Sequence, residues 1–138
     1  LEAAVKSGGG DFVPKEGEKN LYTAGRLEQL LNEDKRLVMV DFTADWCLTC
    51  KTLEKAVLNT DAVQTALKEK EVVQLVADWT EMDSKTGLEI DAELERLGKG
   101  KQLPIIAFYS PGQESQPKTL VAVYTASDIH QILGQLDK

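Results

Sequence analysis

Apolar residues recur along this sequence at two spacings. Some recur every three or four residues, as on the buried face of a helix, and others form short unbroken runs, as in a strand buried on both faces. The helical spacing is clearest after Thr23 and Thr125, whose hydroxyls can cap a helix, and Asp128 would complete a capping box with Thr125. The first predicted helix follows Thr23 and carries Leu27, Leu30 and Leu31. A second runs from the cysteine pair to about residue 57, is broken by a new cap signal at 59–61 and restarts over 62–68. A later helix carries Leu88, Leu94 and Leu97 and ends near Gly98 or Gly100, and the last follows Thr125 and includes Leu136.

Four apolar runs predict strands. Residues 37–42 and 72–77 are apolar without alternation, which fits parallel strands covered on both faces. Pro104 opens a third run at 104–109, where proline is tolerated as a first strand residue, and residues 120–124 would return antiparallel to it. Because helices alternate with the strands, the pattern predicts an α/β fold with a central mixed β-sheet flanked by helices on both faces.

Residues 1–18 lack this apolar pattern and contain a Ser-Gly-Gly-Gly stretch. We expect a flexible N-terminal linker or tail there and one domain over residues 19–138, a length that suits a single hydrophobic core. The chain begins at Leu1 without a signal-peptide pattern, so we expect it to be a piece of a longer protein. No run approaches the roughly 20 apolar residues of a membrane helix, and no direct membrane insertion is expected.

The 138 residues include 23 acidic and 16 basic side chains, which gives a net charge of −7. Nucleic acids and anionic membrane surfaces attract clustered cations, so this balance argues against both as partners. Trp79, Tyr109 and Tyr124 are expected as core or rim aromatics, and the single histidine, His130, as a surface residue.

Cys47 and Cys50 are the main candidates for chemistry, because they lie where a predicted buried strand ends and a predicted helix begins. Two sulfurs three residues apart on a first helical turn lie on one side, and they can form a disulfide if their Cα atoms approach to about 5.5 Å. Free amides and the helix dipole would stabilise a Cys47 thiolate, the attacking species in disulfide exchange. Cys50, one turn further in, suits the resolving role.

The cysteine pair has two other possible interpretations. A structural zinc site needs four ligands, and only His130 remains as a nitrogen ligand, so the ligand count argues against a metal. The cysteines could also be unrelated core residues. The strand before them, the helix after them and the adjacent Trp46 favour a redox motif that needs no cofactor beyond its own disulfide.

Two carboxylates are placed where they could tune this pair. Asp41 interrupts a buried strand, where burial would raise its pKa, and it could accept and return a proton during exchange. The alternative is an aspartate at a strand end that bonds a nearby amide. Glu54, seven residues after Cys47 and four after Cys50, shares their helical stripe and would disfavour the thiolate. The alternative is a solvated glutamate paired with a neighbouring lysine.

Residues 40–55, VDFTADWCLTCKTLEK, resemble thioredoxin-family active sites. Together with VADWT at 76–80 they look like the C-terminal thioredoxin-like domain of the thiol:disulfide interchange protein DsbD, over about residues 20–137 in element order. The resemblance implies a thioredoxin-like fold and a protein-disulfide reductase, with Cys47 as nucleophile and Cys50 as resolving thiol. Asp41 and Glu54 match the acidic residues that tune the nucleophile.

The same resemblance implies partner-binding residues. Pro104 matches the cis-proline beside the active site, although the general preference of X-Pro bonds favours trans. Leu103 would offer its backbone to an extended partner segment, and Trp46 would lie in the same contact area. Residues 102–105 depart from the glycine and small residues common around this proline, which bears on partner preference.

In that family the domain lies on the periplasmic side of the bacterial inner membrane. Its partners are the transmembrane and N-terminal domains of the same protein, and the isolated domain is expected to be monomeric. Two alternatives stay open at this point. One is a free-standing thioredoxin or a cytochrome-maturation reductase, and the other is a protein-binding module that keeps the fold without redox chemistry.

Overall fold

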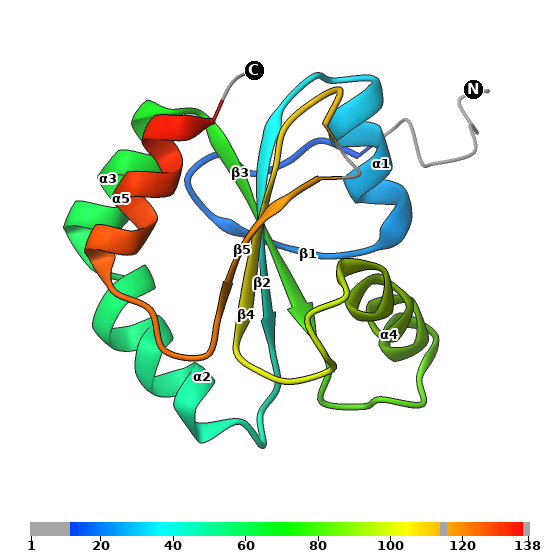
Figure 1. Ribbon diagram of the computed structural model, residues 1–138. Coiled ribbons are helices and arrows are strands. Elements are labelled where there is room, and N and C mark those ends of the chain that lie inside the picture. The colour runs from blue at the N-terminus through cyan, green and yellow to red at the C-terminus, as the bar shows by residue number, and fades with distance from the viewer. Residues whose placement is uncertain (1–11, 114–115, 137–138) are drawn as a thin grey trace.

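The computed structural model describes residues 12–113 and 116–136, which form one mixed sheet between two layers of helices (Figure 1). The strands are β1 (Lys19–Leu21), β2 (Leu37–Thr43), β3 (Val72–Asp78), β4 (Ile105–Tyr109) and β5 (Lys118–Val121). The helices are α1 (Ala24–Asn32), α2 (Leu48–Leu53), the π-helical turn η1 (Glu54–Leu58), α3 (Asp61–Glu69), α4 (Lys85–Leu97) and α5 (Ala126–Gln135).

The strands lie in the order β1-β3-β2-β4-β5. β1 and β2 both run parallel to β3, whereas β4 is antiparallel to β2 and to β5. All seven residues of the central strand β2 are buried, as its unbroken apolar run predicts. The α/β fold with a mixed sheet is therefore confirmed.

Alternate residues of β2 face two separate hydrophobic cores. Val38, Val40 and Phe42 pack with α1 and α4 on one face of the sheet, whereas Leu37 and Met39 pack with α2, α3 and α5 on the other (Figure 1). By the same alternation, Asp41 belongs to the face covered by α2 and α5.

Hydroxyl caps set the starts of the helices. The Thr125 hydroxyl accepts the Asp128 amide while the Asp128 carboxylate accepts the Thr125 amide, so the predicted capping box is present. Thr60 starts α3 directly after η1, which confirms the expected break in the long helical segment. Gly98 ends α4 in the left-handed conformation, with φ of 72°.

Two strands differ from the sequence-based expectation. The pattern missed β1, because only Asn20 among its three residues is buried. β5 ends at Val121 instead of residue 124, because Ala122 has φ of 67° and turns the chain out of the extended conformation. Tyr124 therefore lies outside the strand, in the connection to α5.

Part of the segment expected as a linker contacts the domain. The backbone of Phe12 exchanges two hydrogen bonds with the Gln29 side chain, and Arg36 forms a bidentate ion pair with Glu16. Residues 1–11 lie outside the described residues, so the boundary at residue 18 stays a prediction.

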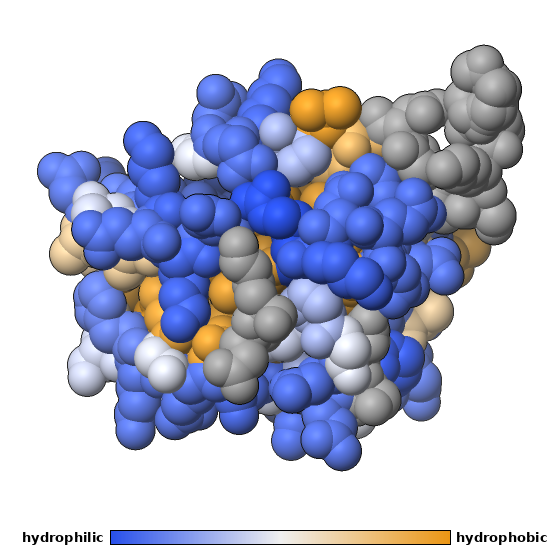
Figure 2. Space-filling model, turned by 90° about the horizontal axis from the view of Figure 1, so that it is seen from above, coloured by the Kyte–Doolittle hydropathy of each residue, from blue (hydrophilic) through white to orange (hydrophobic). Residues whose placement is uncertain are grey.

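One edge of the sheet gathers the segments that matter for chemistry. β2 and β3 end there, β4 begins there, and the connection from β5 to α5 crosses it, at the bottom of Figure 1. Figure 2 views the opposite edge, where hydrophilic side chains cover most of the surface. None of the helices in the described segments is long and apolar enough to cross a membrane.

Candidate active site

Cys47 and Cys50 form a disulfide at the start of α2. Their Cα atoms are 5.3 Å apart, within the range that a disulfide needs. Cys47 is the N-cap residue, and the Cys50 amide donates a hydrogen bond to its sulfur at 3.2 Å. Cys47 is 8% exposed and Cys50 only 1%, so the outer sulfur is the one that a partner can approach.

Backbone contacts hold the loop between β2 and α2. The Cys47 amide donates to the Ala44 carbonyl at 3.1 Å, which closes a tight turn before the helix. The Asp45 amide donates to the Thr80 hydroxyl at 2.8 Å, which ties this loop to the segment after β3. The position of Cys47 thus depends on two neighbouring strand ends.

Two tryptophans lie at this edge. Trp46 is 55% exposed, and its ring centroid is 6.2 Å from that of the buried Trp79. Leu48, on the first turn of α2, is also exposed. Two exposed apolar side chains, Trp46 and Leu48, thus flank Cys47, beside the exposed and charged Asp45.

Leu103, which precedes Pro104, lies against the cluster that holds the disulfide. The peptide bond between them is cis, as the resemblance implied and contrary to the general X-Pro preference. Leu103 packs against Cys47 and Cys50. The Pro104 carbonyl accepts a hydrogen bond from the Ala122 amide at 2.9 Å, so the connection after β5 borders the same site.

Asp41 is buried, at 3% exposed, in the middle of the sheet. Burial, together with the charge of Glu54 and a hydrogen bond to it, raises the Asp41 pKa to about 8. Oδ1 of Asp41 has no hydrogen-bond partner among the described residues, which argues against the alternative of a carboxylate that caps an amide. Asp41 therefore holds a proton at neutral pH.

Glu54 starts η1 one turn beyond Cys50, and its amide donates to the Cys50 carbonyl. Its side chain is only 14% exposed, and Oε2 is buried without a partner among the described residues. Oε1 lies 3.7 Å from the Lys51 ammonium, so the expected lysine contact exists beside the contact with Asp41. We refer to Asp41 and Glu54 below as the acid pair.

The sequence did not single out Tyr124 for this site. It is 2% exposed, its hydroxyl has no partner among the described residues, and the charges of Asp41 and Glu54 reach it. The sequence pattern continued β5 through residue 124. Nothing in it indicated that the Tyr124 side chain packs in the core that includes Leu53 of α2.

Comparisons with known proteins define the class. Residues 23–111 match the thioredoxin-like protein family, and the chain belongs to that family. In fold it is similar to a thioredoxin from Thermus thermophilus, with a TM-score of 0.64 and 21% identity over 88% of this chain and 87% of that one. The C-terminal domain of DsbD from Neisseria meningitidis gives a TM-score of 0.53 and 23% identity over 81% and 88% of the two chains.

Sequence similarity points to one group within the family. The chain is 34% identical over 102 residues to the thiol:disulfide interchange protein DsbD of Salmonella typhimurium, and 40% identical over 78 residues to that of Colwellia psychrerythraea. These alignments cover 73% and 56% of this chain but only 17% and 12% of the two DsbD proteins. The domain is therefore a thioredoxin-fold disulfide oxidoreductase, similar to one part of DsbD.

The redox group of such a domain is its own cysteine pair, and it needs no cofactor. Within residues 12–113 and 116–136, no cluster of three or more His, Cys, Asp or Glu side chains is arranged to hold a metal ion. The chemistry of the site therefore rests on the two sulfurs and the acid pair.

Proposed function

We propose that this domain is the periplasmic, electron-relaying part of a DsbD-like membrane reductase and that it reduces protein disulfides. The observation that carries the proposal is the acid pair, of which Glu54 lies one helical turn from Cys50. An ionised carboxylate there disfavours the Cys47 thiolate, so the dithiol gives up its electrons readily. The 34% identity to a thiol:disulfide interchange protein supports the same direction of transfer.

The exchange begins at Cys47, the more exposed of the two sulfurs. Its thiolate attacks one sulfur of a partner disulfide, which forms a mixed disulfide and releases the other partner sulfur as a thiolate. The amide of Cys50, which donates to the Cys47 sulfur, supplies a local stabilising dipole for the attacking anion.

Cys50 resolves the mixed disulfide. Its thiol gives its proton to Asp41 in the minor fraction of molecules in which that carboxyl is ionised at neutral pH, and the resulting thiolate attacks the Cys47 sulfur. The Cys47–Cys50 disulfide closes, the partner leaves as a dithiol after taking up protons, and two electrons have passed to it. Because the Asp41 pKa is about 8, its carboxylate can both accept and return this proton near neutral pH.

The partner would dock on the side chains that flank the disulfide. Trp46 and Leu48 supply exposed side chains, and Leu103 lies beside the cysteines just before the start of β4. An extended partner segment can add its backbone beside Leu103 in the manner of an extra strand. This arrangement brings the partner disulfide to Cys47.

Trapping the mixed disulfide tests the proposal. A Cys50→Ala variant should accumulate a disulfide-linked complex with the N-terminal domain of a DsbD-like protein, because the resolving thiol is missing. The matched Cys47→Ala variant keeps one buried thiol and should trap at most a few per cent of that amount. Equal trapping by both variants, or none by Cys50→Ala, would contradict the assignment.

A further inference from the structure

The segment after β3 is joined to the turn that carries Cys47. Asp78 ends β3 and pairs with Thr43, the last residue of β2. One residue further, the Trp79 amide donates a hydrogen bond to the Thr43 carbonyl at 2.7 Å. The two parallel strands therefore stay joined up to the residue before the turn at Ala44.

The Thr80 side chain continues this connection. Its hydroxyl donates to Oδ1 of Asp78, and the Thr80 amide donates to the same oxygen at 3.0 Å. A hydroxyl has a single proton, so once that proton is given to a carboxylate the oxygen can only accept. The hydrogen bond that it accepts comes from the Asp45 amide at 2.8 Å. Asp78 thus fixes the orientation of the hydroxyl that holds Asp45.

Asp45 lies inside the turn that presents the outer sulfur. The turn closes where the Cys47 amide donates to the Ala44 carbonyl at 3.1 Å. Trp46, also in the turn, has its ring centroid 6.2 Å from that of Trp79, so side chains join the same two segments. Any movement of this turn therefore moves the Cys47 sulfur.

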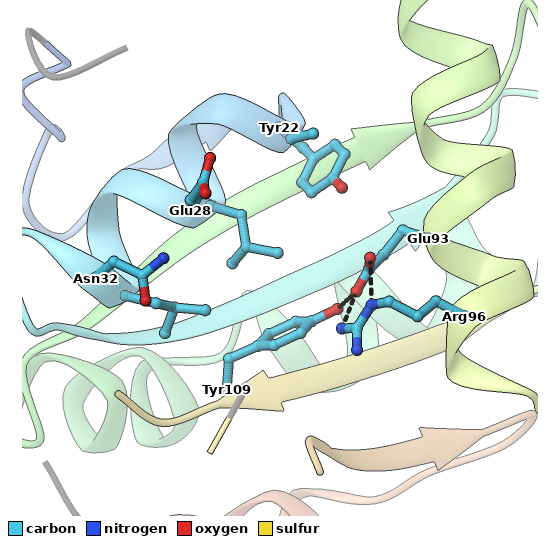
Figure 3. A pocket seen from close by; sticks show the side chains of 9 residues that line it. Tyr22, Glu28, Asn32, Glu93, Arg96 and Tyr109 are labelled. Atoms are coloured by element: carbon cyan, nitrogen blue, oxygen red, sulfur yellow. Dashed lines mark hydrogen bonds and ion pairs between the residues drawn. The ribbon is translucent and has the colours of Figure 1, made fainter. Parts of the chain in front are cut away.

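A second hydroxyl–carboxylate contact lies far from the disulfide and serves as a comparison. The Tyr109 hydroxyl donates to Glu93 at 2.5 Å, and the Arg96 guanidinium donates to the same carboxylate, beside a pocket of about 290 Å³ between α1 and α4 (Figure 3). Tyr109 ends β4, whose first residue, Ile105, lies at the edge that holds the site. The Tyr109 contact therefore lies at the opposite end of the strand from the site.

We propose that Thr80 is a positioning residue whose hydroxyl holds the turn before α2, so that the Cys47 thiol stays within reach of Cys50. Cys50 is fixed independently, since it lies within α2 and is only 1% exposed. A dithiol whose two sulfurs are already held in place loses less conformational freedom when the disulfide closes. The Thr80 hydrogen bond therefore favours the disulfide over the dithiol, which makes the domain a stronger reductant. The inference rests on the proposed function, because a stronger reductant passes electrons to partner disulfides more readily.

The test is the equilibrium of the domain with glutathione, with and without the substitution Thr80→Val. Two glutathione thiols reduce the Cys47–Cys50 disulfide and leave as one glutathione disulfide, so two electrons and two protons pass to the cysteine pair. Valine keeps the branched shape of threonine without the hydroxyl, and water can bind the freed amide because Asp45 is exposed. The variant should shift this equilibrium about tenfold toward the dithiol, since the effective concentration of the thiols falls when positioning is lost. That factor equals a rise of about 30 mV in the reduction potential of a two-electron couple.

Three further variants separate positioning from a general loss of stability. Thr80→Ser keeps the hydroxyl and should retain the potential of the unaltered domain. Thr86→Val makes the same change at an exposed residue that lines one pocket together with Thr80, and it should leave the potential unchanged. Tyr109→Phe removes the remote hydroxyl–carboxylate contact and should also leave the potential unchanged. An unchanged potential in Thr80→Val, an equal shift in Thr86→Val or Tyr109→Phe, or a Thr80→Ser variant that behaves like Thr80→Val would overturn the proposal.

A measurement on the unaltered domain needs no substitution. Amide hydrogen exchange followed by NMR should show the Asp45 amide protected about tenfold or more against its rate in an unstructured peptide, because it donates to Thr80. An Asp45 amide that exchanges at the peptide rate contradicts the proposal even where the variant fails to fold. The shift between variants is a difference in potential, whereas the proposed function is tested by trapping and by the absolute potential. Each can therefore fail without the other.

Discussion

Asp41 keeps its proton at neutral pH because its carboxyl lies inside the domain beside Glu54. A carboxylate in an ordinary solvated position is ionised at this pH and cannot return a proton that it accepts. The proton transfer with Cys50 that we propose depends on this raised pKa. The same burial has a cost in stability, which can be measured.

We predict that Asp41→Asn removes a pH dependence of stability. The folded pKa of about 8 lies above the ordinary value of 3.8, so between these values the folded state binds more protons than the unfolded state. The free energy of unfolding should therefore decrease as the pH rises from about 4 to 8. Above pH 8 this carboxyl should cause no further decrease. At pH 8 the variant should gain roughly 2–4 kcal/mol in unfolding free energy.

Urea denaturation at a series of pH values measures this gain. Asp83→Asn, at an exposed position in the loop before α4, is the control and should follow the unaltered protein. If Asp41→Asn loses as much stability between pH 4 and 8 as the unaltered protein, the account of the buried carboxyl is wrong.

We also predict that Asp41→Asn slows resolution of the mixed disulfide. General base catalysis contributes about 100-fold or more, so release of the partner should slow by roughly that factor at pH 8. Trp46 and Trp79 lie near the disulfide, and their fluorescence in a stopped-flow experiment follows its formation. A variant that resolves at the normal rate would exclude Asp41 as the proton acceptor.

The sequence was sufficient to find residues related by short spacing. Cys47, Cys50 and Glu54 lie on one helix, and Asp41 was visible as a charge within an apolar strand. Tyr124 could not be found in this way, because it shares a core with Leu53 and Met39, which are far from it in sequence, and the left-handed turn at Ala122 has no signature in an alanine.

Helices and buried strands were predicted well because each carries a local signal. Hydroxyl caps mark the starts of α1, α3 and α5, and the glycine after α4 marks its end. β1 and the end of β5 were not predicted correctly. A strand of three residues and a turn at a non-glycine residue depend on tertiary contacts, which leave no local signal.

Two helical glycines give an opposed pair of predictions. A Cβ on Gly87 in α4 would lie 2.2 Å from the Glu81 carbonyl oxygen and 2.6 Å from that of Met82, so Gly87→Ala must displace the backbone that follows Trp79. We expect a loss of about 1–3 kcal/mol. Gly134 in α5 has nothing within 4 Å, and Gly134→Ala should gain about 0.5–1 kcal/mol from helix propensity.

Thermal or urea unfolding of the two variants distinguishes these effects. Because both substitutions add the same methyl group to a helix, propensity alone would stabilise both. A Gly87→Ala variant as stable as the unaltered protein would show that the backbone before α4 can move at little cost in free energy. That result would contradict the close contact in the structure.

At the scale of the whole molecule, function is concentrated at one edge. The disulfide, the exposed Trp46 and the cis-Pro104 segment all lie there, while the opposite edge is mostly hydrophilic (Figure 2). The sequence predicted this redox class, but partner identity depends on chains that bind this edge and lie outside the domain.

The proposed direction of electron transfer can be tested by the reduction potential of the Cys47–Cys50 pair. It can be measured by equilibrating the domain with a series of glutathione ratios and trapping free thiols. The account predicts a reversible two-electron couple near the thioredoxin value of roughly −270 mV, as expected for a domain that passes electrons to protein disulfides. A value near −120 mV, typical of strong disulfide donors, or the absence of a reversible disulfide would contradict it.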